Sequence, residues 1–141
     1  MFLLDVNILI ALAWDDHVSH PAAHNWFVKN VQTGFATCHV TQSGFVRVSL
    51  SLYSTSSGLT APQAITMLDK LTSHTKHSFW EDGAVETRSN IWKTVRGHKQ
   101  VTDANLFLIA KRNQGALATF DRDIRGRLPQ TEQNWVEVID S

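Results

Sequence analysis

Three aspartates occupy positions from which their carboxylates could meet. Asp5 follows the apolar run MFLL, Asp121 follows GALATF, and Asp103 lies near the start of TDANLFLIAKRN. Each has a local explanation, because Asp5 or Asn7 could cap a helix, Asp103 could complement a helix dipole, and Asp121 could begin a turn. Together they indicate a bound cation, since carboxylates that lie close together repel one another unless they are protonated or bridged by a cation.

Mg²⁺ and Mn²⁺ are the cations that suit such oxygen ligands, and both also bind substrate phosphates. A metal ion held in this way can lower the pKa of a bound water and neutralise charge on a phosphate during an in-line displacement. A second ion roughly 3.5–4 Å away would stabilise the leaving oxygen. The three aspartates are therefore predicted to be both the metal ligands and the catalytic residues of an enzyme that acts on a phosphate.

The segments around these aspartates alternate between strand and helix patterns. Apolar strands are predicted at 1–5, 35–40, 77–80, 115–120 and 135–139. Helices are predicted at 7–14, 20–31, 41–52, 61–73, 83–95 and 102–113, the last with Thr102 as its N-cap. This alternation predicts a parallel sheet with helices on both faces, in which ligands bind at the carboxyl ends of the strands near a topological switch. Asp5 and Asp121 stand at two such ends.

Composition narrows the class of protein. A chain of 141 residues with 43% hydrophobic and 18% charged content predicts one soluble domain, residues 1–141. No apolar stretch has the length of a membrane span, and the first residues lack the pattern of a signal peptide. The single cysteine, Cys38, excludes an internal disulfide and a site of paired cysteines, and it suits a reducing cytoplasm.

The net charge of zero is unevenly distributed. Nine of the 13 lysines and arginines but only three acids lie between Arg88 and Arg127, so this stretch carries 9 − 3 = +6 and the rest of the chain −6. Such a basic segment indicates an anionic partner, of which phosphate is the commonest kind. The candidates for contacts with these phosphates are Lys93, Arg96, Lys99, Arg122 and Arg125.

The stretches LLDVNILIAL, TQSGFVRV and VTDANLFLIAKRNQGALATFDRD, together with the short final strand, resemble the PIN-domain ribonucleases of the VapC toxin type. The resemblance runs nearly end to end. It implies a PIN-like three-layer α/β/α sandwich with a mainly parallel central sheet of four to five strands. It also implies Mg²⁺- or Mn²⁺-dependent endonucleolytic cleavage of RNA, with water as the attacking group, and neutralisation by a small cognate antitoxin. Homodimerisation is a further expectation.

The resemblance also assigns roles to residues. Asp5, Asp103 and Asp121 match the acidic positions of the family, with Asp5 and Asp103 as direct metal ligands and Asp121 acting through water or a second ion. Asn7 and Thr119 match supporting polar residues. Gln42 departs from the pattern, because the family commonly has a glutamate there, and an amide offers an oxygen but no negative charge. This departure leaves the occupancy of a second metal site open, and Asp123 could compensate.

Three other functional classes fit less well. Gln42 leaves open the alternative of a PIN module that binds RNA or a protein without cutting. A phosphatase of the haloacid dehalogenase type needs a second aspartate two residues after the first, where this chain has Asn7. A receiver domain would need an acidic pair after the first strand.

Histidine and tryptophan residues provide weaker candidates. His20 and His24 fall on one helix face beside His17, a pattern that could bind zinc, although solvent-facing or partner-facing histidines are favoured. His98 could touch RNA. For the five tryptophans, packing or oligomer contacts are favoured over stacking on bases; they are Trp14, Trp26, Trp80, Trp92 and Trp135.

Overall fold

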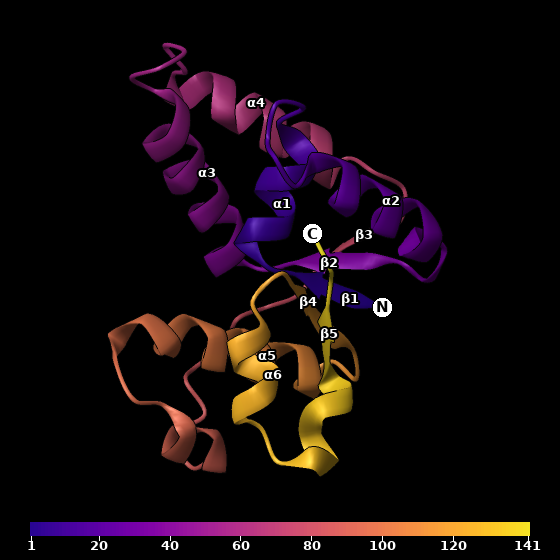
Figure 1. Ribbon diagram of the computed structural model, residues 1–141, viewed down its shortest axis with the longest axis vertical. Coiled ribbons are helices and arrows are strands. Elements are labelled where there is room, and N and C mark those ends of the chain that lie inside the picture. Colours follow the sequence, from indigo (N-terminus) through magenta and orange to yellow (C-terminus); the bar gives the residue numbers. More distant parts are fainter.

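Five short parallel strands form one sheet at the centre of the molecule (Figure 1), in a computed structural model that describes all residues 1–141. The strands are β1 Phe2–Leu4, β2 Phe35–Thr37, β3 His77–Phe79, β4 Ala116–Thr119 and β5 Val136–Val138. Their order is β3-β2-β1-β4-β5, and all four pairings are parallel. The chain therefore runs outward from β1 to β3 and then returns to β4 on the other side of β1. The predicted parallel α/β sheet is confirmed, and its topological switch lies between β1 and β4.

Helices cover both faces of this sheet and complete three layers. On one face lie α1 Val6–Ala13, α2 His20–Asn30, α3 His39–Tyr53 and α4 Ala61–Thr72; on the other lie α5 Val101–Arg112 and α6 Arg122–Arg127 (Figure 1). Short 3₁₀ helices span Val31–Thr33, Asn90–Thr94, His98–Gln100 and Gln130–Trp135. No helix of the chain combines the length and the apolar character that crossing a membrane requires.

The strands divide the core between the two faces, because successive side chains point to opposite sides of a sheet. Leu3 and Leu117 pack with the α5 layer, whereas Leu4 and Ala118 pack with α1 and α3. All four side chains are fully buried. Burial on both faces explains why these strands read as continuous apolar runs rather than alternating ones.

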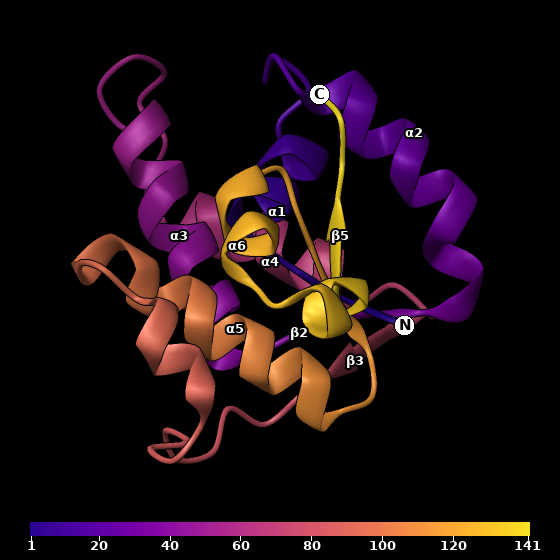
Figure 2. The same cartoon turned by 60° about the horizontal axis from the view of Figure 1, so that its bottom comes forward.

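The sequence prediction of a helix over 83–95 is wrong. Only a 3₁₀ helix forms there, and the segment 81–100 folds beside α5 as an irregular excursion (Figures 1 and 2). The excursion begins with Asp82, whose carboxylate accepts hydrogen bonds from the backbone of His39 and Val40 at 2.7 and 3.1 Å. Gly83 follows with φ +67°, outside the helical region, against the side chain of Arg112.

The predicted start of the next helix is also wrong by one or two residues. α5 begins at Val101 with Gln100 as its N-cap, so Thr102 is already helical. The reason is that the 3₁₀ turn His98–Gln100 runs directly into α5, and the chain has no extended residue at Thr102 to act as a cap. Asp103 nevertheless lies in the first turn, as predicted.

Candidate active site

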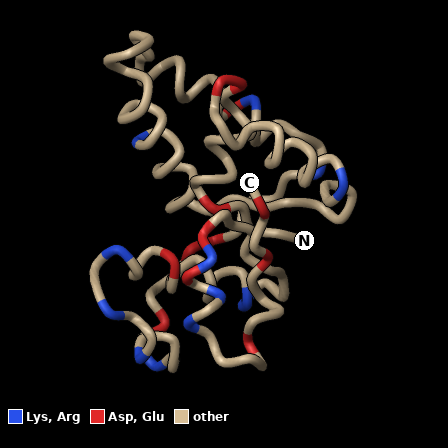
Figure 3. Tube along the Cα trace, viewed as in Figure 1, with Lys and Arg blue, Asp and Glu red and all other residues tan.

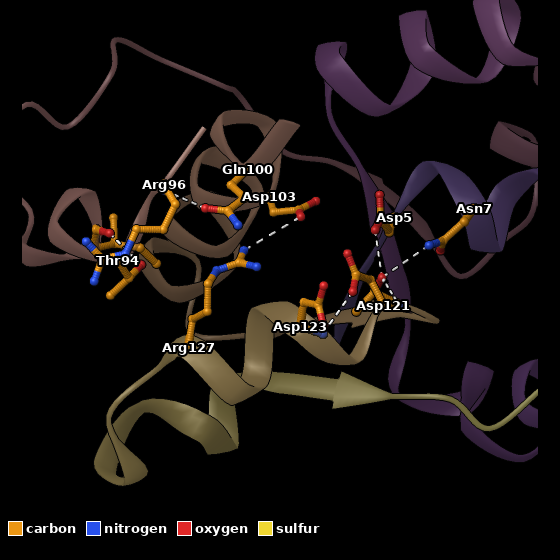
Figure 4. Close-up of polar contacts among 11 residues, drawn as sticks. Asp5, Asn7, Thr94, Arg96, Gln100, Asp103, Asp121, Asp123 and Arg127 are labelled. Carbon is orange, nitrogen blue, oxygen red and sulfur yellow. Dashed lines mark hydrogen bonds and ion pairs between the residues drawn. The ribbon is translucent and has the colours of Figure 1, made fainter. Parts of the chain in front are cut away.

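The carboxylates of Asp5 and Asp121 lie at the switch point of the sheet, after the adjacent strands β1 and β4 (Figure 4). Asp5 continues the ladder, since its backbone N–H donates to the Ala118 carbonyl at 3.0 Å. Asp103 reaches the same region from the first turn of α5 (Figure 4). The structure thus brings together three acids that are far apart in the sequence.

Asp5 is 8% exposed and is held by two short hydrogen bonds. Its Oδ1 accepts from the Val6 N–H and its Oδ2 accepts from the Thr119 hydroxyl, both at 2.7 Å. The first contact makes Asp5 the N-cap of α1. Burial raises the pKa of Asp5, the two hydrogen bonds oppose the rise, and the negative charge of Asp121 adds to it.

Thr119 connects the polar residues of this rim. Its hydroxyl donates to Asp5 and accepts from the Asp121 N–H at 3.0 Å and from Asn7 Nδ2 at 3.3 Å. Asn7 Oδ1 in turn accepts from the Phe120 N–H at 3.4 Å. Thr119 therefore contacts Asp5 directly, whereas Asn7 contacts Thr119 and the backbone of Phe120, and the two side chains fix the end of β4 against the start of α1.

The pKa of Asp103 is raised as well. Burial, and after it repulsion from Asp5 and Asp121, raises this pKa to about 6. The positive charge of Arg127 opposes the rise. The Arg127 guanidinium lies 3.9 Å from Asp103 Oδ2, with both side chains about one-fifth exposed. No part of the sequence pattern had singled out this pair, because Arg127 reaches Asp103 from the end of α6.

Asp121 also has a structural role. Its Oδ1 accepts from the Asp123 N–H at 2.8 Å, so Asp121 is the N-cap of α6. Asp123 is exposed and lies near enough to add weakly to the repulsion on Asp103. The acidic group thus extends along the first turn of α6, as Figure 4 shows.

The donor set suits a hard divalent cation, because it consists of carboxylates whose mutual repulsion a cation would relieve. Burial is the largest cause of the raised pKa of Asp5 and of Asp103, and repulsion from neighbouring aspartates adds to both. No three His, Cys, Asp or Glu side chains converge closely enough to form a complete set of metal ligands. The assignment of Asp5, Asp103 and Asp121 as ligands therefore remains a prediction.

Gln42 lies in the first turns of α3, after β2, and is anchored to the protein by one hydrogen bond. Its Nε2 donates to the Thr37 hydroxyl at 3.0 Å. Because the carboxyl ends of β2 and β1 are adjacent, Gln42 belongs to the same rim as Asp5. It forms no hydrogen bond with any of the three aspartates.

The basic residues separate into paired and unpaired groups. Lys111, Arg112, Arg122 and Arg127 form ion pairs with Glu132, Glu86, Asp140 and Asp103 respectively. The other five basic residues of the 88–127 stretch form none; they are Arg88, Lys93, Arg96, Lys99 and Arg125. Figure 3 shows most of the basic residues on the α5 side of the sheet, with acidic residues gathered toward the centre. Four of the five residues predicted to contact RNA are therefore without a competing acid.

His17, His20 and His24 do not form a group that could hold a metal ion. His20 Nδ1 lies 2.7 Å from the Ala11 carbonyl, and His17 Nδ1 accepts from the Ser19 N–H at 3.1 Å. His98 is exposed in the 3₁₀ turn before α5. The five tryptophans are all half-buried and pack against the two cores, as favoured from the sequence.

Comparison with known proteins finds several similar ribonucleases. Over 121 residues the chain is 40% identical to ribonuclease VapC39 of Mycobacterium tuberculosis, covering 84% of this chain and 87% of that protein. Ribonuclease VapC38 of the same organism is 37% identical over 139 residues, 99% of this chain and 98% of the relative. Ribonuclease VapC44 is 40% identical over 124 residues, with coverages of 86% and 87%.

The fold has a solved counterpart in the toxin VapC20 of Mycobacterium tuberculosis. The TM-score is 0.64 at 15% identity, and the match covers 89% of this chain and 94% of VapC20. No family model matches the chain. The PIN-type fold is thus confirmed, and the chain belongs to the VapC ribonuclease family.

Proposed function

We propose that this protein is a metal-dependent endoribonuclease and the toxin of a toxin–antitoxin module. The observation that carries the proposal is the placement of Asp5, Asp103 and Asp121 at the switch point, where burial first and the negative charge of neighbouring aspartates second raise the pKa of Asp5 and Asp103. The similarity to proteins named ribonuclease VapC supports RNA as the substrate. Phosphodiester hydrolysis is the chemistry that such a cluster suits once it holds Mg²⁺ or Mn²⁺.

Asp5 and Asp103 are the residues we assign as direct ligands, and Asp121 acts through water or a second ion. The bound ion would supply Lewis acidity toward the phosphate and lower the pKa of nearby water. Thr119 and the Val6 N–H hold the Asp5 carboxylate in place, and Asn7 holds Thr119, so the rim is organised before any ligand binds. Preorganised charge of this kind requires little rearrangement during reaction.

The unpaired basic residues near the acids provide the contacts for the RNA backbone. Lys93, Arg96 and Lys99 lie on the excursion before α5, and Arg125 lies on α6; all four are exposed. Arg122, the fifth predicted contact, is paired with Asp140 and would have to exchange partners. Contacts of this kind hold the polyanion in register and give affinity that depends on salt.

The same proposal includes the setting of the protein. Residues 1–141 act as a single PIN domain in the cytoplasm, as a homodimer, and a cognate antitoxin neutralises the activity. Arg125 and Arg127, next to the acids, are basic residues that an acidic antitoxin segment could meet.

The test is cleavage of a structured RNA by the purified protein with Mg²⁺ or Mn²⁺, compared with the Asp5→Asn variant. Asparagine keeps an oxygen that can accept from the Val6 N–H, so the variant should fold while losing the charge. Cleavage that requires the metal and disappears in the variant is expected. Cleavage that survives both EDTA and Asp5→Asn would refute the proposal.

Measurements of Mn²⁺ and RNA binding distinguish the proposed ribonuclease from a PIN module that does not cut. If Mn²⁺ does not bind but RNA does, the protein is a PIN module that binds without cutting, which is the alternative that Gln42 leaves open. Hydrolysis of small phosphomonoesters through a trapped aspartyl phosphate would instead indicate a phosphatase of the haloacid dehalogenase type.

A further inference from the structure

A chain of three polar side chains links the first turns of α3, the carboxyl end of β2 and the start of β3. Gln42 Nε2 lies 3.0 Å from Thr37 Oγ1, and Thr37 Oγ1 lies 2.7 Å from His77 Nε2. Thr37 is fully buried, whereas Gln42 and His77 are half-buried. The chain connects the edge of the sheet to the rim that carries Asp5.

The donors and acceptors of this chain can be arranged in two ways. A threonine hydroxyl has one proton to donate, and His77 and Gln42 are its only side-chain partners. In the first arrangement Gln42 donates to Thr37 and Thr37 donates to an unprotonated His77 Nε2. In the second, His77 Nε2–H donates to Thr37, Thr37 donates to the Gln42 carbonyl oxygen, and the amide is turned over. The orientation of Gln42 and the protonation of His77 are therefore linked.

The surroundings of His77 select the first arrangement. The NH₂ group of Gln42 donates to Thr37 at 3.0 Å, so the Thr37 hydroxyl proton is directed to His77 Nε2 at 2.7 Å, and the proton of the neutral ring lies on Nδ1. Burial lowers the pKa of His77, the Thr72 carbonyl opposes this, and His74 lowers the pKa further. The ring is thus neutral at pH 7.5, with its single proton on Nδ1 and a free lone pair on Nε2.

In the first arrangement the Gln42 carbonyl oxygen is free to accept a hydrogen bond or to bind a cation. It accepts no hydrogen bond within the protein, and it is not among the buried atoms that lack a partner, so it reaches solvent. In the second arrangement the NH₂ group would occupy this place and present donors in place of an acceptor. An acceptor at this position is compatible with a cation or its water, and a donor is not.

We propose that Thr37 and His77 are positioning residues that turn the Gln42 amide so that its carbonyl oxygen, not its NH₂ group, faces the rim shared with Asp5. This explains how an amide can stand where a glutamate is common. The value of the orientation to catalysis rests on the proposed function, but the orientation itself does not, and it can be measured without RNA.

The test is the tautomer of His77, read from ¹⁵N-labelled histidine spectra at pH 7.5, with His77→Asn identifying its signals among the seven histidines. Protonation of Nδ1 alone is expected, although free neutral histidine favours the proton on Nε2. Gln42→Glu should reverse the chain, because a carboxylate only accepts: Thr37 then donates to Glu and His77 Nε2 gains a proton.

Two matched variants isolate the cause. Gln42→Leu removes the amide without adding an acceptor and should leave Nδ1 protonated and Nε2 free. Gln130→Glu adds the same charge at an exposed position beyond β4, toward the opposite edge of the sheet, and should also change nothing. A proton on Nε2 in the unmodified protein would overturn the proposal. So would a His77 that does not respond to Gln42→Glu, or that responds equally to Gln130→Glu. Loss of RNA cleavage would bear on the proposed function alone.

Discussion

Replacing Asp103 with asparagine should stabilise the metal-free protein at neutral pH while abolishing its activity. The folded protein raises the pKa of this carboxyl from 3.8 to about 6, chiefly through burial and the charges of Asp5 and Asp121. Ionisation of Asp103 therefore costs more in the folded state than in the unfolded state. Asparagine has similar size and cannot ionise, so it avoids that cost.

The magnitude follows from linkage. One pH unit of difference in pKa corresponds to about 1.36 kcal/mol, so the rise from 3.8 to about 6 corresponds to roughly 3 kcal/mol at pH 7. The attraction to Arg127 is already included in that pKa, but asparagine also loses hydrogen-bonding capacity as an acceptor. We therefore expect Asp103→Asn to raise the free energy of unfolding by about 1–3 kcal/mol.

The sign can be checked with pH. Between pH 4 and 6 the folded protein binds more protons at Asp103 than the unfolded chain does, so the Asp103 contribution makes stability fall as pH rises through this window and level off above it. The contribution is absent from Asp103→Asn. The difference in stability between the variant and the unmodified protein should therefore grow from pH 4 to 6 and then stay constant.

The assay is urea unfolding followed by tryptophan fluorescence, in EDTA, at half-unit steps from pH 4 to 8. Asp69→Asn provides the control, because Asp69 is an exposed aspartate on α4 on the other face of the sheet. Its stability difference should not vary with pH in this way. A destabilised Asp103→Asn at pH 7, or a difference that is flat from pH 4 to 6, would refute the electrostatic reasoning.

Two further predictions concern the support of the acids and the binding of RNA. Thr119→Val removes the hydroxyl that donates to Asp5 at 2.7 Å and should lower the free energy of unfolding by about 2–3 kcal/mol. The control is Thr66→Val, at an exposed position. Equal urea midpoints for Thr119→Val and the unmodified protein would contradict the role of this hydrogen bond. Arg125→Gln should weaken RNA binding and reduce the steepness of the plot of log binding constant against log salt concentration by about 0.7, the value for one lost phosphate contact with single-stranded RNA. Fluorescence anisotropy titrations measure this slope. An unchanged slope would exclude Arg125 from the RNA interface.

The rim of the sheet could be predicted because the signals that define it are local. Apolar strands alternating with helices predict parallel pairing, and in a parallel sheet the residues that follow the strands meet at one edge. Asp5 and Asp121 were placed correctly by that reasoning alone. The contacts of Asn7 and Thr119 were anticipated only through the family resemblance, since neither residue type at its position requires a partner 112 residues away.

What could not be predicted depends on contacts between distant segments. Asp82 caps α3 across 43 residues of sequence, and this capture holds the start of the 83–95 segment, where a helix was expected. Arg127 reaches Asp103 only because α6 and α5 share one face of the sheet. A contact between two segments that are far apart in the sequence produces no periodic pattern of apolar residues. Helix propensity therefore favoured a helix over 83–95, where tertiary contacts impose another structure.

Asp5 shows why the structural and the catalytic explanations of a residue need not compete. As the N-cap of α1 it satisfies a backbone N–H, and the same bond, with that from Thr119, stabilises the ionised carboxylate that burial disfavours. A carboxylate without these donors would be protonated more readily at this position and would attract a cation less. The capping contact is thus a condition for the proposed metal-binding role: it keeps a negative charge, in a fixed orientation, at the point where β1 and β4 diverge.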